Sequence, residues 1–257
     1  ARIRGAGLSL PPRLVAVLEL ESGLNDPMAV LLTLQLVGAF TIPGPFSPGL
    51  AVLSFVTELL GGVAIGLGGA AALAWAIRRL RFGPGLVPVL GVAGALALFG
   101  AAQVLHVSGF LAVFLAGAVL GNVEIPDREA LTRFFGALGW LAQIALFLML
   151  GLLVTPHELP VLPSLALALL LILVARPLAS ALCLPWFGFS RREVGFAAWV
   201  GLRGAVPIYL AIIPVLAEVP GGGRLFNVAF VIVLASLVVQ GWTIGPAARL
   251  LRLGPDG

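Results

Sequence analysis

A short apolar stretch near the start of the chain, LELESGLNDPMAVLLT (18–33), holds four oxygen-bearing side chains: Glu21, Ser22, Asn25 and Asp26. In a helix the first and third of these stack one turn apart, as do the second and fourth, so all four fall within an arc of about 140°. Pro27 lacks an N–H and would free the carbonyl of Gly23 close to the same face. Such oxygens are ligands for a small hard cation. A carboxylate there can also bind a proton, so cation and proton could compete for one aspartate.

The composition identifies the surroundings of this stretch. Of the 257 residues 60% are hydrophobic and 10% charged, and the mean hydropathy is +1.14, whereas soluble domains are about 25% charged. The sequence therefore predicts an all-α polytopic membrane protein without a soluble domain. All 15 basic residues are scattered arginines, which argues against a nucleic-acid partner. The single Cys183 cannot form an internal disulfide.

Apolar stretches long enough to cross a bilayer recur along the chain. We expect eight spans, at about 13–40, 50–78, 86–105, 108–122, 138–154, 160–186, 194–217 and 225–247. The arginines in the joints alternate, twelve on one side and one on the other, so both ends of the chain are predicted to be cytoplasmic. The segment at about 125–137 is typical of an amphipathic helix at the cytoplasmic surface.

Two further arginines, Arg176 and Arg203, lie inside spans, at about the depth of Asp26. A charge at the bilayer centre costs at least about 2.5 to 3.5 kcal/mol, so such residues usually pair with one another or mark an ion path. The simpler alternative is a static ion pair that only holds helices together. That alternative suits Glu21 better than Asp26, which is flanked by the other oxygen-bearing side chains.

The span 194–217 contains its own signals for a break: Gly201, Gly204, Pro207 and Pro214. Pro207 would free the carbonyl of Arg203, and the glycines permit an unwound segment, as in the discontinuous helices of secondary transporters. An ordinary proline kink is the alternative. Because Arg203 lies inside the break, the functional interpretation is favoured.

The motifs LESGLNDPMAV and WVGLRGAVPI, together with RPLA and LAQIALFLMLGLLVTP, resemble the signatures of NhaP-type cation/proton antiporters. The first motif is most similar to the bacterial potassium/proton branch. The resemblance covers essentially the whole chain and implies a homodimer in the lipid of the bacterial inner membrane. It also implies exchange of K⁺ or Na⁺ against protons by alternating access, with a dimerisation domain and a moving core domain. The core-type helices would be those at about 13–40 and 160–247.

The resemblance assigns roles to individual residues. Asp26 would bind the cation transiently, or a proton, while Ser22 contributes a ligand and Asn25 stabilises the helix. Glu21 would pair with Arg176. The residues expected to support charge pairing and the helix break are Glu21, Arg176, Arg203, Pro27, Gly201, Gly204 and Pro207.

The family pattern also includes an earlier broken helix with a Thr-Asp pair, which this sequence lacks. We therefore expect the 257 residues to match the last eight spans of a longer protein and not to transport alone. A non-transporting fragment with a structural role and a transporter of another class remain alternatives. A membrane-embedded hydrolase would need a Ser/His pair, two intramembrane aspartates or a His-Glu-x-x-His helix, and the spans contain none of these. A secondary transporter rather than an enzyme is expected, with no cofactor.

Other polar and small residues in the spans have simpler interpretations. Gln35 and Gln143 are expected to form hydrogen bonds between helices, and the Gly62–Gly66 pair is expected to be a helix-packing face.

Overall fold

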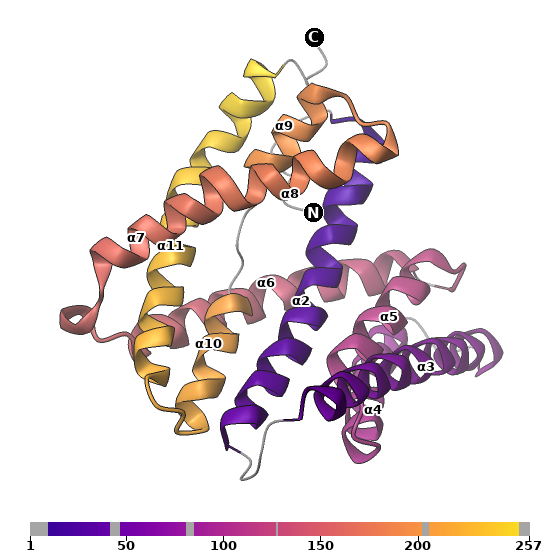
Figure 1. Cartoon of the computed structure of the whole chain (residues 1–257). Coiled ribbons are helices and arrows are strands. Elements are labelled where there is room, and N and C mark those ends of the chain that lie inside the picture. The colour runs from indigo at the N-terminus through magenta and orange to yellow at the C-terminus, as the bar shows by residue number, and fades with distance from the viewer. Residues whose placement is uncertain (1–9, 42–46, 81–84, 127, 202–205, 252–257) are drawn as a thin grey trace. The chain divides into compact units, whose positions relative to one another are not determined.

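The computed structural model describes residues 10–41, 47–80, 85–126, 128–201 and 206–251 (Figure 1). The regular structure of these residues is helical, which confirms the predicted all-α fold. The helices are α2 (Pro12–Thr41), α3 (Pro48–Leu80), α4 (Leu86–Val104), α5 (Gly109–Asn122), α6 (Arg128–Leu153), η1 (Pro156–Glu158), α7 (Val161–Leu170), η2 (Leu171–Ala175), α8 (Arg176–Cys183), η3 (Leu184–Phe187), α9 (Arg191–Trp199), α10 (Val206–Leu216) and α11 (Gly222–Leu250).

Six of these helical segments are long and apolar enough to cross a membrane: Pro12–Thr41, Pro48–Arg79, Leu86–Val104, Arg128–Leu153, Val161–Phe187 and Gly222–Leu250. Two shorter apolar helices, α5 and α10, fall in the remaining two predicted spans. Each of the eight predicted spans therefore corresponds to a helix or to a broken pair of helices. In the most apolar 18-residue window of each long segment at most 28% of the residues are buried, which leaves apolar surface that lipid could cover.

Helix α6 differs in extent from the sequence expectation. The segment at about 125–137 does not form a separate helix, because from Arg128 onward its residues are the first turns of α6, which continues to Leu153. The sequence at this junction, ALGW, contains a single glycine and no proline, so nothing forces the helix to end there. A surface position for the first turns of α6 stays a prediction.

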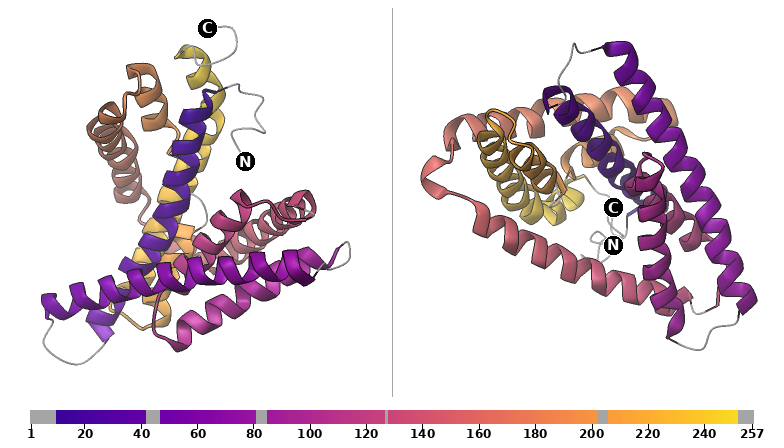
Figure 2. Two further views of the ribbon diagram at one scale, coloured as in Figure 1. Left: turned by 90° about the vertical axis from the view of Figure 1, so that its right-hand side faces the viewer. Right: turned by 90° about the horizontal axis from the view of Figure 1, so that it is seen from below.

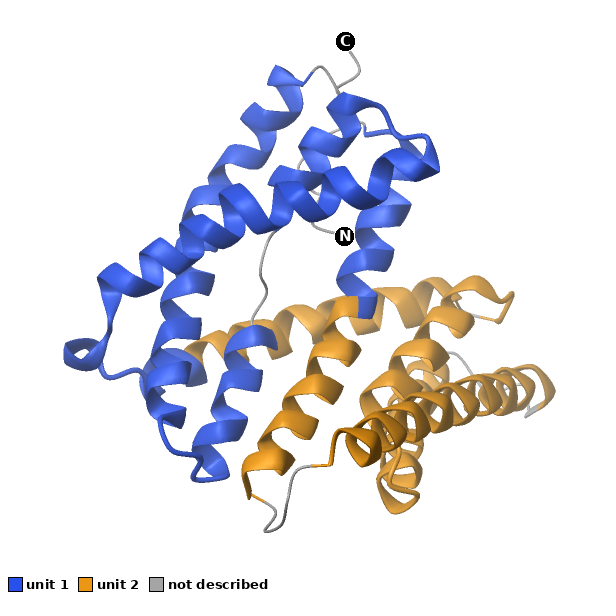
Figure 3. Cartoon of the chain, in the orientation of Figure 1, with its two compact units in different colours: residues 1–24, 149–257 blue, residues 25–148 orange. Residues whose placement is uncertain are grey.

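The chain divides into two compact units (Figure 3). Unit 1 comprises residues 1–24 and 149–257, and unit 2 comprises residues 25–148. The helices α2 and α6 each contribute residues to both units.

Unit 2 is built around the packing of α3, α4 and α5, whose ribbons lie together in each view (Figures 1 and 2). A Cβ atom on Gly62 would lie 2.9 Å from the carbonyl oxygen of Ser108, and one on Gly66 would lie 2.7 Å from that of Ala112. The two glycines therefore let the backbones of α3 and α5 approach closely, which confirms the predicted packing face.

Gln35 connects α2 to α3 within unit 2. Its Nε2 donates to Oε1 of Glu58 at 2.6 Å, and its Oε1 accepts from Oγ of Ser54 at 3.1 Å, which confirms the expected interhelical bond. Gln143 has no hydrogen-bond partner in the described part of the chain, and its prediction stays open.

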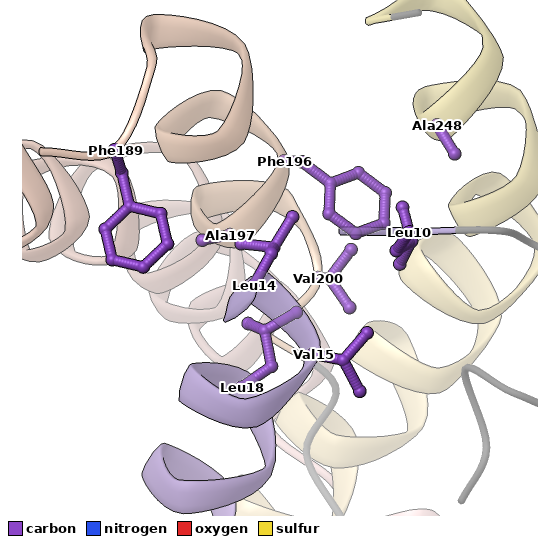
Figure 4. Packing of buried hydrophobic residues seen from close by; sticks show 9 residues of the cluster. All are labelled: Leu10, Leu14, Val15, Leu18, Phe189, Phe196, Ala197, Val200 and Ala248. Atoms are coloured by element: carbon purple, nitrogen blue, oxygen red, sulfur yellow. The ribbon is translucent and has the colours of Figure 1, made fainter. Parts of the chain in front are cut away.

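The core of unit 1 joins the first turns of α2 to α9 and α11 (Figure 4). Its buried residues are Leu10, Leu14, Val15, Leu18, Phe189, Phe196, Ala197, Val200 and Ala248. Phe196 and Leu14 are completely buried. This packing fixes the start of α2 beside the end of α9, which is where the candidate site lies.

Helices α7 and α8 are joined without a loop by η2, a turn of π-helix. Pro177 directly follows this turn and Arg176, and it has no N–H to continue the α-helical hydrogen bonds. Its ring would also crowd the carbonyl one turn earlier, at Leu173, so the wider turn accommodates the proline inside a continuous helical segment.

Candidate functional site

Glu21 and Arg176, two residues of opposite charge that were predicted to lie inside spans, lie together in unit 1. Arg176 donates from Nη1 to Oε1 of Glu21 and from Nη2 to Oε2 at 3.0 Å. The two side chains are 24% and 35% exposed. The planar guanidinium thus holds both carboxylate oxygens, the strongest geometry that such a pair can adopt. Glu21 is therefore already neutralised by a fixed cation.

Gly201 packs against the same guanidinium. A Cβ atom at this position would lie 2.6 Å from Nε of Arg176 and 3.0 Å from its Cδ. Nε is buried and has no hydrogen-bond partner among the residues that the structure describes. The arginine is thus enclosed by the carboxylate of Glu21 and the backbone at Gly201, and only glycine leaves room for it. The sequence indicated Gly201 as a point of unwinding, but not this spatial role.

The helix in the span 194–217 is broken, as predicted. Helix α9 ends at Trp199, Val200 and Gly201 are not helical, and α10 begins at Val206. Two residues predicted to belong to the break, Arg203 and Gly204, lie outside the described residues.

Pro207 lies in the first turn of α10. The first N–H groups of a helix have no intrahelical partner, so a proline there removes no helical hydrogen bond. Pro207 is therefore part of the start of the second half-helix, and does not interrupt an existing one.

A buried polar network on α11 supports the end of α9. Nε2 of Gln240 donates to the carbonyl oxygen of Trp199 at 2.8 Å, and Oγ of Ser236 donates to Oε1 of Gln240 at 2.5 Å. Nε1 of Trp199 donates to Oγ1 of Thr243 at 2.9 Å. Sequence reasoning did not identify these residues. Their spacing of four and three places them on one face of α11, a signal that could have found them.

The predicted cation-binding residues lie on α2, which remains helical through Pro27. Ser22, Asn25 and Asp26 are exposed, whereas Pro27 is buried. Within the described ranges, Asp26 has no hydrogen-bond or ion-pair partner. The structure thus pairs Glu21 with Arg176 and leaves Asp26 unpaired among these residues. No group of three or more His, Cys, Asp or Glu side chains that could hold a metal occurs in the same ranges.

Comparison with known proteins decides the family. The family model described as "Sodium/hydrogen exchanger, transmembrane" matches residues 7–250. The chain belongs to the sodium/hydrogen exchanger family. The NhaP-type resemblance of its motifs is thereby confirmed, and relatives that carry the name NhaP agree with it.

The chain is similar to curated bacterial proteins. It is 43% identical over 258 residues to the K(+)/H(+) antiporter NhaP of Alkalimonas amylolytica, covering 97% of this chain and 45% of the relative. It is 27% identical over 256 residues to the Na(+)/H(+) antiporter NhaS2 of Synechocystis, covering 95% and 47%. The chain therefore spans a little under half the length of these relatives.

A solved structure shares the fold of this chain. The sodium proton antiporter MjNhaP1 from Methanocaldococcus jannaschii, at pH 8, matches with a TM-score of 0.80 and 25% sequence identity. The match covers 96% of this chain and 66% of the other. A protein that exchanges sodium and protons thus contains the same arrangement of helices.

Proposed function

We propose that the protein containing this chain exchanges a monovalent cation against protons across a membrane. The observation that carries the proposal is the contrast between two acids on one helix. Glu21 is held by both donor nitrogens of Arg176, whereas Asp26 has no partner in the described residues. A carboxylate that a fixed cation already neutralises cannot exchange charge easily, whereas an unpaired one can bind a cation or a proton in turn. The names of the similar proteins support this function.

In this mechanism Asp26 is the exchange site. Ser22 and Asn25, on the same face of α2, supply neutral oxygen and amide groups beside it. A cation that reaches Asp26 displaces its proton, and the proton displaces the cation on the other side of the membrane. Alternating access requires that only one side be open at a time, so the two ions exchange without a leak.

Glu21, Arg176 and Gly201 position the break between α9 and α10. We propose that they hold the unwound backbone at a fixed distance from α2, and that Arg203 and Gly204 contribute to the same break. The two half-helices then present their ends toward the ion path, as helix ends do in other secondary transporters.

The same proposal includes the oligomeric state of the protein, its membrane and its orientation. We infer a homodimer in the bacterial inner membrane, surrounded by lipid, with both ends of this chain on the cytoplasmic side. The alternation of arginines between joints supports that orientation, because cytoplasmic loops are enriched in basic residues.

The deciding experiment uses the complete gene product in everted membrane vesicles that have been acidified by respiration. A pH-sensitive dye reports proton efflux after K⁺ or Na⁺ is added. We expect efflux from the wild type and a loss of at least about tenfold in the Asp26→Asn variant. Glu129→Gln, which removes an exposed carboxylate from the first turn of α6, is the matched control and should transport normally.

Two outcomes would contradict the proposal. Undiminished efflux in Asp26→Asn would remove Asp26 from the exchange site. A wild-type protein that is present in the vesicles but gives no efflux with either ion would refute antiport of these cations. K⁺ and Na⁺ accept the same oxygen ligands, so the ligands do not distinguish the two ions. Adding each ion in a separate experiment identifies the one that is transported.

A further inference from the structure

A groove in unit 2 runs along one face of α3 beside α5. Its cavity has a volume of about 820 Å³. The α3 residues that line it recur every three or four positions and include Ala70, Ala71, Ala74, Trp75, Arg78 and Arg79. We call this the α3–α5 groove. Because the spacing matches the helical repeat, the groove follows the helix axis.

The floor of the groove is smooth and apolar. Its three alanines carry no atoms beyond Cβ, and Ala70 and Ala74 are buried, at 0% and 8% exposure. Trp75 lies toward the end of α3, and 63% of it is exposed. A tryptophan with an apolar ring and a polar N–H is typical of the boundary between hydrocarbon and headgroups.

Arg78 and Arg79 line the end of the groove that also contains Trp75. Nε and Nη2 of Arg78 donate to the carbonyl oxygen of Glu124 at 3.0 Å and 2.8 Å, which fixes its guanidinium, and Nη1 has no partner among the described residues. Arg79 has no hydrogen bond or ion pair with a described residue. Within the described part of the chain no carboxylate lies within 4.0 Å of either guanidinium, so two positive charges meet an apolar channel without an internal counter-ion.

The length of the groove fits one leaflet of a bilayer. Eleven residues separate Leu67, at its far end, from Arg78. At about 1.5 Å per residue the distance is roughly 16 Å. The hydrocarbon core of a bilayer is about 30 Å thick, so the groove is about as long as one leaflet.

We propose that the α3–α5 groove binds one anionic phospholipid, with its phosphate at Arg78 and Arg79 and an acyl chain along the alanine floor. Charge complementarity favours a phospholipid with a net negative charge over a zwitterionic one, because basic pockets between membrane helices bind anionic headgroups. The apolar floor favours a lipid over a free anion. A helix of another protein would bury the floor, but it would leave both arginines unpaired unless it also carried an acid.

The test is native mass spectrometry of the purified complete gene product in detergent. The probes are dioleoylphosphatidylglycerol, dioleoylphosphatidylcholine and glycerol phosphate. We expect retention of phosphatidylglycerol only. Arg78→Gln/Arg79→Gln should weaken its binding about 30-fold, which corresponds to about 2 kcal/mol for two basic residues near an anionic headgroup. Arg191→Gln/Arg192→Gln, at the start of α9, is the matched control and should bind normally.

Two single variants separate lipid binding from misfolding. Arg79→Gln leaves the contact of Arg78 with Glu124 intact and should weaken binding about fivefold. Ala71→Phe fills the floor at an exposed position and should reduce lipid binding without changing the charge. Equal binding of both phospholipids, binding of glycerol phosphate as tight as that of the lipid, or wild-type lipid binding by Arg79→Gln would each overturn the proposal.

Discussion

Replacing Gly201 by alanine should strain the contact between the helix break and Arg176. The added Cβ would lie 2.6 Å from Nε and 3.0 Å from Cδ, closer than carbon atoms in proteins approach such neighbours. The guanidinium cannot move away freely, because both of its terminal nitrogens donate to Glu21. The methyl group must therefore displace either the ion pair or the backbone of the break.

The size of this overlap determines the expected loss in the free energy of unfolding. Overpacking of a well-filled interior costs about 1 to 3 kcal/mol. For a chain of this size, 1 kcal/mol corresponds to roughly 2 to 4 °C in the melting temperature. We therefore expect Gly201→Ala to lower the melting temperature by about 4 to 8 °C, taking about 2 kcal/mol as the loss. Transport should fall as well, because the displaced groups position the break.

The assay is thermal unfolding of the complete gene product in a mild detergent, followed by intrinsic fluorescence. Gly195→Ala is the matched control, since it lies in α9 and its Cβ would be 3.9 Å from the nearest atom. Alanine at an unstrained helical position gains about 0.5 to 1 kcal/mol over glycine, so this control should be at least as stable as the wild type.

A third variant tests whether the ion-paired side chain of Arg176 causes the loss of stability in Gly201→Ala. In the Glu21→Gln/Arg176→Gln background the side chain at position 176 is shorter and is no longer held by an ion pair. The cost of Gly201→Ala should therefore shrink there to less than half. A melting temperature of Gly201→Ala within about 1 °C of the wild type, or an equal cost in both backgrounds, would refute this reasoning.

Two further substitutions test the packing in each unit by the same melting assay. Gly66→Ala should cost about 1 to 3 kcal/mol, because its Cβ would lie 2.7 Å from the backbone oxygen of Ala112. Gly68→Ala, with no atom within 4 Å, should be neutral or stabilising, and equal melting of the two variants would contradict close packing. Gln240→Leu should cost about 1 to 3 kcal/mol by leaving the carbonyl of Trp199 without its donor, and an unchanged melting temperature would show that the bond contributes nothing.

The sequence was sufficient to predict the helices that cross the membrane. Long apolar stretches have few alternatives to helices in lipid, since every backbone polar group must be satisfied within the segment. The break near Gly201 could also be predicted, because glycine and proline weaken a helix wherever they cluster. Electrostatics indicated only that the acids and arginines within the spans would pair, since charges in lipid are costly unless they meet, and the resemblance to the NhaP-type motifs assigned Glu21 to Arg176.

The remaining features depend on contacts between segments far apart in the chain. The contact of Gly201 with Arg176 depends on how the non-helical backbone that follows α9 packs against α8. The bond from Gln240 to Trp199 likewise depends on which face of α11 turns toward α9. Periodicity shows that a helix has a polar face, but it does not show which neighbour that face meets.

The π-helical turn between α7 and α8 has a consequence for the rotational phase of this span. In α7 the buried residues Ser164 and Ala168 are four residues apart, and α7 contacts α11. A π turn holds about one residue more than an α turn. Deleting one residue from 171–175 would therefore turn this wider turn into an ordinary α turn, and would leave both the direction of Arg176 relative to that buried face and the length of the span almost unchanged. A one-residue gap at this point in a related sequence is therefore compatible with an arginine that faces the same neighbour.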